Sequence, residues 1–368
     1  MIKYFLQSLL ILGLYFLHFG LQAGEEKTSP ARSLKVLHLT LHKGCAEEIE
    51  AVAKELSLDL TTWLIQSLPP YWFDGFAQGN ALYNIGHERA ERVWNLHKDF
   101  FNSFDAIITS DTAPLSRIFV QNKWKKPLII WICNRFDYHD HSSLDCEFPD
   151  KEYYELFAKA CTQKNVKVIG YTAYEHRYTK IKGVDTGSEV IKPTGKFIKE
   201  GLESLIPSHV KKSDTFFLPP YHNELHFINA SKYYSSLGIE NYCGRYNGSR
   251  DLEGFKAIIH LPYAWSNLAL FENLYLGTPY LIPSPKFMEE LIRQDNYFLT
   301  TDVTAFYLSE WYDPANAPFF IFFDSWEDLS IKIKTIDFTA RREVVKKLGQ
   351  EHAEKTLQKW RKVFGIES

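Results

Sequence analysis

Residues 258–285 read IIHLPYAWSNLALFENLYLGTPYLIPSP and contain three elements in succession. The apolar run at 257–261 predicts a buried strand, and a mostly apolar helix follows with Ser266 or Asn267 as its N-cap. Gly277 marks the end of this helix, and an apolar segment bounded by prolines predicts the next strand. This order of strand, polar loop, helix and strand is that of a βαβ unit.

The loop before this helix is a predicted ligand site. It lies at the carboxyl end of a strand, where open α/β sheets bind ligands. Ser266 and Asn267 stand at the helix N-terminus, whose dipole and N–H groups favour an anion. Glu272 is an acid in an otherwise apolar helix near the same loop.

The same stretch resembles the nucleotide-sugar site of GT-B glycosyltransferases of the family 1 and family 4 type. The shared features are the polar loop, the helix carrying Phe-Glu-Asn and the Gly-Thr-Pro before an apolar strand. The resemblance is clearest over 258–285 and extends more weakly over most of the chain. It implies that Glu272 holds the ribose of a UDP- or GDP-sugar co-substrate, and that neither a bound cofactor nor a metal is needed. Many retaining members carry a second acid eight residues earlier; Ala264 stands there, so the stereochemistry stays open.

The expected fold class is α/β, with two Rossmann-like domains facing each other across a cleft. A chain of 368 residues is too long for one ordinary core. We assign 34–200 to an N-terminal domain that binds the acceptor and 201–338 to a C-terminal domain that binds the nucleotide-sugar. Residues 339–368 form a last helix, which the resemblance predicts to pack back across both domains.

The N-terminus predicts export or membrane anchoring. Residues 1–24 combine Lys3 with a long apolar run and end on Ala23 and Gly24, as in a signal peptide or an uncleaved signal-anchor. The polar segment 25–33 argues against a first helix of the folded domain. This location conflicts with a donor made in a bacterial cytoplasm, unless the segment anchors the enzyme where the donor is present.

The first half of the chain has the strand–loop–helix rhythm of a Rossmann-like domain. The strand at 34–41 runs into His42-Lys43-Gly44-Cys45 and a helix at 46–56, without a complete GxGxxG motif. Two further strands end in polar residues that should meet at one edge of the sheet, since parallel strands end together. These polar residues are Asp111, Asn134, Arg135 and Asp137.

The candidate catalytic bases are Asp137 and His87. An inverting transferase needs a base on the acceptor side. A lone histidine is more often structural, which weighs against His87. Asp137 with the following His139-Asp140-His141 also suggests a metal cluster, but these ligands are crowded within five residues, and we expect no metal site.

Two cations are candidate ligands of the donor phosphates. Arg245 lies in a loop flanked by glycines, and Lys196 follows Thr194-Gly195 near the predicted domain boundary. The alternative interpretations are a turn arginine and a solvated linker lysine.

These features predict a glycosyltransferase acting on a glycan, lipid or protein acceptor. The alternative from another class is an exported, two-lobed sugar-binding protein without catalysis, and a GT-B sugar epimerase is a third candidate. The net charge of −3 gives no reason to expect a nucleic-acid partner.

Overall fold

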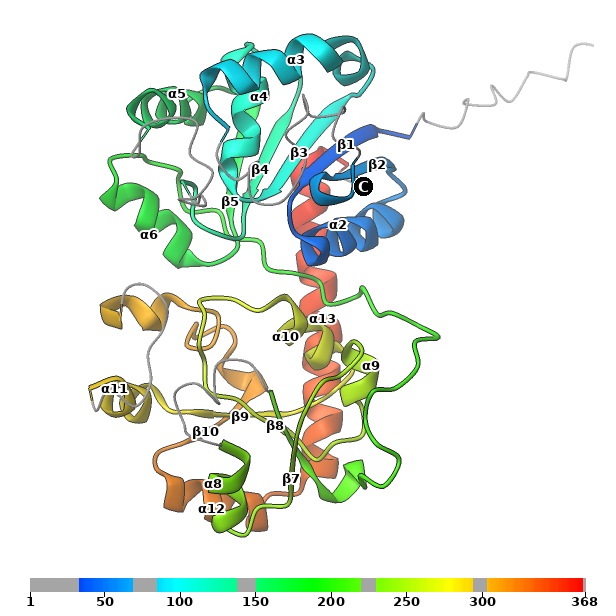
Figure 1. Cartoon of the computed structure of the whole chain (residues 1–368), viewed down its shortest axis with the longest axis vertical. Coiled ribbons are helices and arrows are strands. Elements are labelled where there is room, and N and C mark those ends of the chain that lie inside the picture. Colours follow the sequence, from blue (N-terminus) through cyan, green and yellow to red (C-terminus); the bar gives the residue numbers. More distant parts are fainter. Residues whose placement is uncertain (1–32, 69–84, 138–149, 220–229, 294–302, 367–368) are drawn as a thin grey trace, which may run out of the picture. The chain divides into compact units, whose positions relative to one another are not determined.

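The computed structural model describes residues 33–68, 85–137, 150–219, 230–293 and 303–366 (Figure 1). The predicted signal peptide or anchor at 1–24 lies outside these residues. Within the described part of the chain, no helix combines the length and the apolar character needed to cross a membrane.

The first sheet has five parallel strands in the order β2-β1-β3-β4-β5. Every residue of β3 and β4 is buried, as expected where helices cover both faces of a parallel sheet. The strands are β1 (Lys35–Thr40), β2 (Asp59–Leu64), β3 (Ala106–Asp111), β4 (Leu128–Ile132) and β5 (Val166–Gly170). The helices of this half are α2 (Lys43–Leu56), α3 (His87–Asn102), α4 (Arg117–Gln121), α5 (Lys151–Cys161) and α6 (Ala173–Ile181), with short 3-10 turns η1 (Ile65–Ser67) and η4 (Ala113–Ser116).

The second sheet repeats this arrangement, with parallel strands in the order β7-β6-β8-β9-β10. The strands are β6 (Phe216–Leu218), β7 (Asn241–Cys243), β8 (Ile258–Ile259), β9 (Tyr280–Pro283) and β10 (Phe320–Phe323). The helices are α8 (Ala230–Ser236), α9 (Ser249–Leu252), α10 (Leu268–Tyr275), α11 (Pro285–Arg293), α12 (Trp326–Thr335) and α13 (Phe338–Phe364), with 3-10 turns η6 (Lys212–Asp214), η7 (Val303–Leu308) and η8 (Ala317–Phe319). The protein therefore contains two parallel-sheet α/β domains.

The predicted βαβ unit is β8, α10 and β9. Asn267 is the N-cap of α10, and its side chain accepts a hydrogen bond from the backbone N–H of Ala269 at 3.1 Å. β8 spans two residues where five were predicted, which lengthens the loop before the helix. Ser325 caps α12, because its hydroxyl accepts from the backbone N–H of Asp328 at 3.0 Å.

The segment before the second domain runs directly against α10. A Cβ on Gly195 would lie 2.2 Å from the carbonyl oxygen of Phe271, and Gly195 has a φ of +72°. Glycine satisfies both conditions, since it has no Cβ and adopts positive φ at little cost. α13 contacts both α2 and α10, and Gly349 permits an equally close approach to the Leu274 carbonyl.

Glu48 on α2 is buried beside this segment and accepts a hydrogen bond from the backbone N–H of Thr194 at 2.6 Å. Burial raises the pKa of Glu48 to about 8, although the Thr194 bond opposes the shift. The folded pKa exceeds the unfolded one, so this contribution to stability is complete below about pH 4.5 and is lost as the pH rises through about 8.

We therefore expect Glu48→Gln to raise the free energy of unfolding at pH 8–9 and to leave it nearly unchanged at pH 4. The gain is on the order of a few kcal/mol, at about 1.4 kcal/mol per pKa unit. Denaturant unfolding at both pH values measures it, with Glu351→Gln, which alters an exposed carboxylate, as the control. Equal destabilisation of Glu48→Gln at both pH values would contradict the prediction.

Candidate functional site

A pocket of about 600 Å³ is lined by residues that follow strands of both sheets. This volume is within the usual range for small-molecule sites. One wall is formed by His42, Cys45, Glu47, Asp111, Cys133 and Asn134, and the other by Tyr246, Tyr263, Ser266, Asn267 and Glu272. In the first sheet the pocket adjoins the ends of β1 and β3, between which the strand order reverses, and such points are the usual ligand sites of open sheets.

Asp111 ends β3 and has a backbone φ of 75°, which is unusual for a residue other than glycine. Its carbonyl holds this conformation by accepting from the N–H groups of Cys133 and Asn134, at 3.0 and 2.8 Å. The side chain is 6% exposed, and its Oδ2 makes no hydrogen bond with the described residues. Burial raises the pKa of Asp111 to about 7; charge on Cys45 adds to the shift and His42 opposes it. Asp111 is therefore an available carboxylate that titrates near neutral pH.

His42 is the N-cap of α2 and lies beside Asp111 and Cys45. Its Nδ1 accepts from the backbone N–H of Gly44 at 3.1 Å. A hydrogen bond with the Cys45 thiol raises the pKa of His42 to about 8, although burial opposes the shift. The cap requires an unprotonated Nδ1, so protonation of His42 breaks the hydrogen bond from Gly44. The protonated ring is instead attracted by Cys45 and Asp111.

Glu272 faces the pocket from the middle of α10. Its carboxylate accepts a hydrogen bond from the Ser249 hydroxyl at 2.6 Å, and Ser249 opens the short helix α9. Burial raises the pKa of Glu272 to about 7, while the Ser249 bond and the charge of Lys199 oppose the shift. The remaining acceptor capacity of this carboxylate suits a ligand hydroxyl.

The N-terminus of α10 opens on the same wall. The backbone N–H of Asn267 donates to the carboxyl group of Glu310, which is fully buried behind the helix. Burial holds the pKa of Glu310 well above its usual range, which favours the neutral acid. A neutral acid satisfies the N–H without cancelling the positive end of the helix dipole.

Lys199 supplies a positive charge at the pocket. Its Nζ lies 3.0 Å from Oε1 of Glu47, which lines the pocket with it, and Lys43 lies 3.8 Å from the same glutamate oxygen. Among the described residues both lysines pair with Glu47, whose side chain is 15% exposed and so reached by solvent, and both can turn towards an anionic ligand.

The two cations predicted from the sequence are elsewhere. Arg245 is exposed, and the pocket is lined instead by its neighbour Tyr246. Lys196 forms ion pairs with Glu55 of α2 at 3.0 Å and Glu354 of α13 at 3.3 Å. Lys196 therefore links two helices, which is a structural role.

Asp137 is buried away from the pocket lining. Its carboxylate accepts from the hydroxyls of Tyr154 and, at 3.4 Å, Tyr178. Burial first, and Asp137 second, raise the pKa values of both tyrosines. Asn134 lines the pocket as its strand-end position suggested, whereas Arg135 and Asp137 do not.

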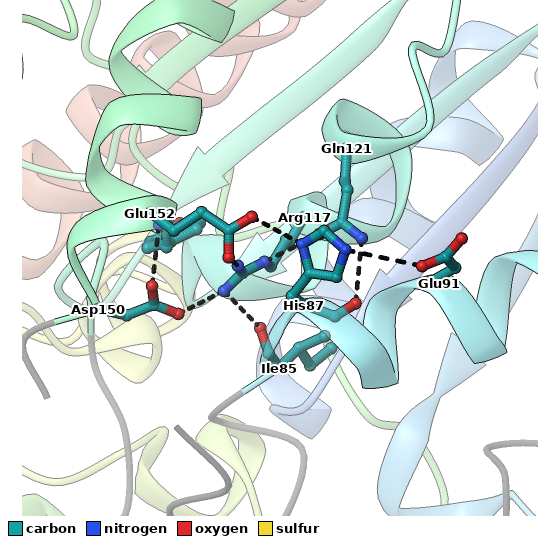
Figure 2. A network of polar contacts seen from close by, with 8 residues as sticks. Ile85, His87, Glu91, Arg117, Gln121, Asp150 and Glu152 are labelled. Atoms are coloured by element: carbon teal, nitrogen blue, oxygen red, sulfur yellow. Dashed lines mark hydrogen bonds and ion pairs between the residues drawn. The ribbon is translucent and has the colours of Figure 1, made fainter. Parts of the chain in front are cut away.

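His87 belongs to a network that joins α3, α4 and α5 (Figure 2). Its Nδ1 lies 2.6 Å from Oε1 of Glu152, and its Nε2 lies 3.6 Å from Glu91. Arg117, 1% exposed, donates to Glu152 at 2.7 Å and to Asp150, and so anchors the network. The arrangement stabilises helix packing and does not bring His87 to the pocket.

Sequence reasoning placed Ser266, Asn267 and Glu272 in the pocket but overlooked Lys199, His42 and Cys45. The signal for the last two was present, since both follow the first strand directly. Among the described residues, no three His, Cys, Asp or Glu side chains are placed to hold a metal ion, and His139-Asp140-His141 lies outside the described ranges.

No family model matches the chain, and no curated protein matches it. Solved structures do match. A UDP-N-acetylglucosamine 2-epimerase is similar over 92% of this chain and 98% of its own, with 11% identity and a TM-score of 0.50. S. aureus MnaA in complex with UDP is similar over 91% of this chain and 98% of its own, with 10% identity and a TM-score of 0.45. The calicheamicin glycosyltransferase CalG4 is similar over 91% of this chain and 99% of its own, with 11% identity and a TM-score of 0.42. At 11% identity and a TM-score of 0.50, the similarity to the epimerase defines the fold alone, and the chain has a divergent GT-B-like fold.

Proposed function

We propose that the protein is a glycosyltransferase that moves a sugar from a UDP-sugar to an acceptor hydroxyl. The observation that carries the proposal is the composition of one pocket. It combines Glu272 and the N-terminus of α10 on one wall with Asp111, an available carboxylate, on the other. The structural neighbour with a TM-score of 0.50 is described as an enzyme of a UDP-sugar, which supports this class of donor.

The donor would bind against α10. The Glu272 carboxylate accepts hydrogen bonds from the ribose hydroxyls. The diphosphate lies at the helix N-terminus near Ser266 and Asn267, where the N–H groups and dipole favour negative charge. Lys199 leaves Glu47 for the phosphate oxygens and stabilises the charge that grows as the sugar departs.

The transfer itself would use Asp111 as general base. The acceptor oxygen forms a bond to the anomeric carbon while the bond from that carbon to the diphosphate oxygen breaks. The acceptor proton passes to the Asp111 carboxylate, and UDP leaves with the electron pair. A group with a pKa near the working pH is well suited to this task. Such a base belongs to an inverting transfer.

Titration of the purified protein with UDP, UDP-sugars and free sugars tests the proposed function. We expect saturable binding of UDP and of at least one UDP-sugar, with release of UDP when an acceptor is added. Binding of free sugar without UDP would favour the alternative, a sugar-binding protein without catalysis.

Lys199→Ala is expected to weaken UDP binding about 5- to 30-fold, because a charge-assisted contact contributes about 1.5–3 kcal/mol and solvent screens part of it at a side chain that is 35% exposed. The loss should shrink as the salt concentration rises. Arg245→Ala and Lys196→Ala are matched controls that remove a cation outside the pocket. Calorimetric titration at two salt concentrations measures the effect, and an equal loss in all three variants would contradict the placement of the phosphates.

A second candidate is a UDP-sugar epimerase, favoured by the description of the neighbour with a TM-score of 0.50. The reactions differ in what they require. An epimerase changes the sugar of UDP-N-acetylglucosamine without an acceptor, whereas a transferase leaves it intact until an acceptor is present. Proton NMR of the nucleotide-sugar incubated with enzyme alone separates them.

We further propose that residues 1–24 direct the chain to export or to a membrane, where the acceptor is a glycan, lipid or protein. The apolar run and its polar flank support this location. Fractionation of a tagged protein with N-terminal sequencing tests it. An intact N-terminus in the soluble cytoplasmic fraction would contradict it.

A further inference from the structure

Two cysteines lie together in the pocket wall, although they are far apart in the sequence. Cys45 is in the first turn of α2 and Cys133 directly follows β4, and both line the pocket. The two thiols lie near enough for each to shift the pKa of the other, and His42 also acts on the pKa of Cys45. Asp111, at the end of the intervening strand β3, holds the backbone of Cys133 through its carbonyl.

We propose that Cys45 and Cys133 are an oxidisable pair, and that their disulfide closes the pocket to the nucleotide. The predicted effect on nucleotide binding rests on the proposed function, whereas the chemistry of the two thiols does not. A disulfide has a sulfur–sulfur distance of about 2.05 Å, well below a hydrogen-bonded contact. Its formation ties the first turn of α2 to the residue that follows β4, on the pocket wall that also carries Asp111.

The neighbours of Cys45 make it the reactive thiol of the pair. Hydrogen bonds from Cys133 and then from His42 lower the pKa of Cys45 to about 6, against the effect of burial. Burial and the charge of Cys45 raise the pKa of Cys133. Cys45 is therefore a thiolate at neutral pH, and Cys133 is a protonated thiol beside it. The thiolate is the nucleophile in such chemistry.

Hydrogen peroxide, as the simplest hydroperoxide, supplies the oxidant. The Cys45 thiolate attacks one peroxide oxygen, the O–O bond breaks, and the second oxygen leaves as water after taking a proton; Cys45 becomes a sulfenic acid. The Cys133 sulfur then attacks the Cys45 sulfur, the S–O bond breaks, and the hydroxyl leaves as water with the Cys133 proton. Two thiols lose two electrons and two protons, and one peroxide becomes two waters.

Mass spectrometry of the full chain tests the pair directly. The reduced protein is treated with hydrogen peroxide, the remaining thiols are alkylated, and a non-reducing digest is searched for the Cys45–Cys133 peptide. We expect this cross-link in the native protein and in Cys161→Ser, and its absence in Cys45→Ser and Cys133→Ser. Oxidation of Cys45 to a sulfinic acid without a cross-link, or a cross-link of Cys45 to another cysteine, would overturn the proposal.

UDP titration of the oxidised protein tests the effect on the pocket. We expect an at least tenfold weaker affinity than in the reduced protein and full recovery with dithiothreitol. The Cys133→Ser variant should bind UDP equally well before and after peroxide. Unchanged affinity in the cross-linked protein would refute the closing of the pocket. A cross-link in a protein that never binds UDP would refute the proposed function while leaving the thiol pair established.

Discussion

Asp111→Asn is expected to lower kcat/KM for sugar transfer about 100- to 10,000-fold, the usual range for loss of a general base. Asparagine has nearly the same shape and tolerates positive φ, so the strained backbone at the end of β3 is retained. The amide, however, cannot accept the acceptor proton. The native enzyme should also lose activity as the pH falls through about 7, because protonation of Asp111 removes the base. This acid limb should disappear from the residual activity of the variant.

The matched control for this experiment is Asp137→Asn. Asp137 is an equally buried carboxylate at a strand end, but it lies outside the pocket and accepts hydrogen bonds from two tyrosines. Asp137→Asn should lower the free energy of unfolding, whereas kcat/KM of the folded fraction should stay close to the native value. UDP affinity of Asp111→Asn should remain close to that of the native protein. If kcat/KM of Asp111→Asn falls by less than about tenfold, Asp111 is not the general base.

Glu272→Ala is expected to weaken UDP binding about 10- to 100-fold. Hydrogen bonds to a charged group contribute about 1.5–3 kcal/mol, and each 1.4 kcal/mol is about tenfold in affinity. The carboxylate is held towards the pocket by Ser249, so it is positioned before the ligand arrives. Calorimetric titration with UDP measures the loss.

A comparison of two nucleotides identifies which ligand atoms Glu272 contacts. If the carboxylate binds the ribose hydroxyls, 2′,3′-dideoxy-UDP should bind the native protein and Glu272→Ala with similar affinity. Ser249→Ala should weaken UDP binding less than Glu272→Ala, because it removes the support and leaves the carboxylate. Equal sensitivity of both nucleotides to Glu272→Ala would show that the residue acts on another part of the ligand.

The local sequence predicted the strands and helices well because their signals are local. The apolar runs of β1, β3 and β4 favoured buried strands, and Asn267 and Ser325 carry the side chains that cap α10 and α12. The order of the unit at 258–285 also placed Glu272 near a ligand loop. Each of these inferences depends on neighbours within about ten residues in the chain.

The predictions for Asp137, His87, Arg245 and Lys196 depended on tertiary contacts that no local pattern contains. Each of these residues has a polar or charged side chain in a suitable segment, as do many residues without a catalytic or binding role. The Asp137 carboxylate accepts hydrogen bonds from two tyrosines. His87 belongs to a network around the buried guanidinium of Arg117. Lys196 joins α2 and α13 through its ion pairs with Glu55 and Glu354.

The sequence by itself determined the strand–helix rhythm of both domains and the helix that carries Glu272. The tertiary structure decided which side chains share the pocket: Asp111 and Cys133 across from Glu272, with Lys199 rather than Lys196 beside it. The physical reason is that strand order and chain crossings bring distant residues together. Burial then sets their protonation, as it does for Asp111 and Glu272, whose pKa values rise to about 7.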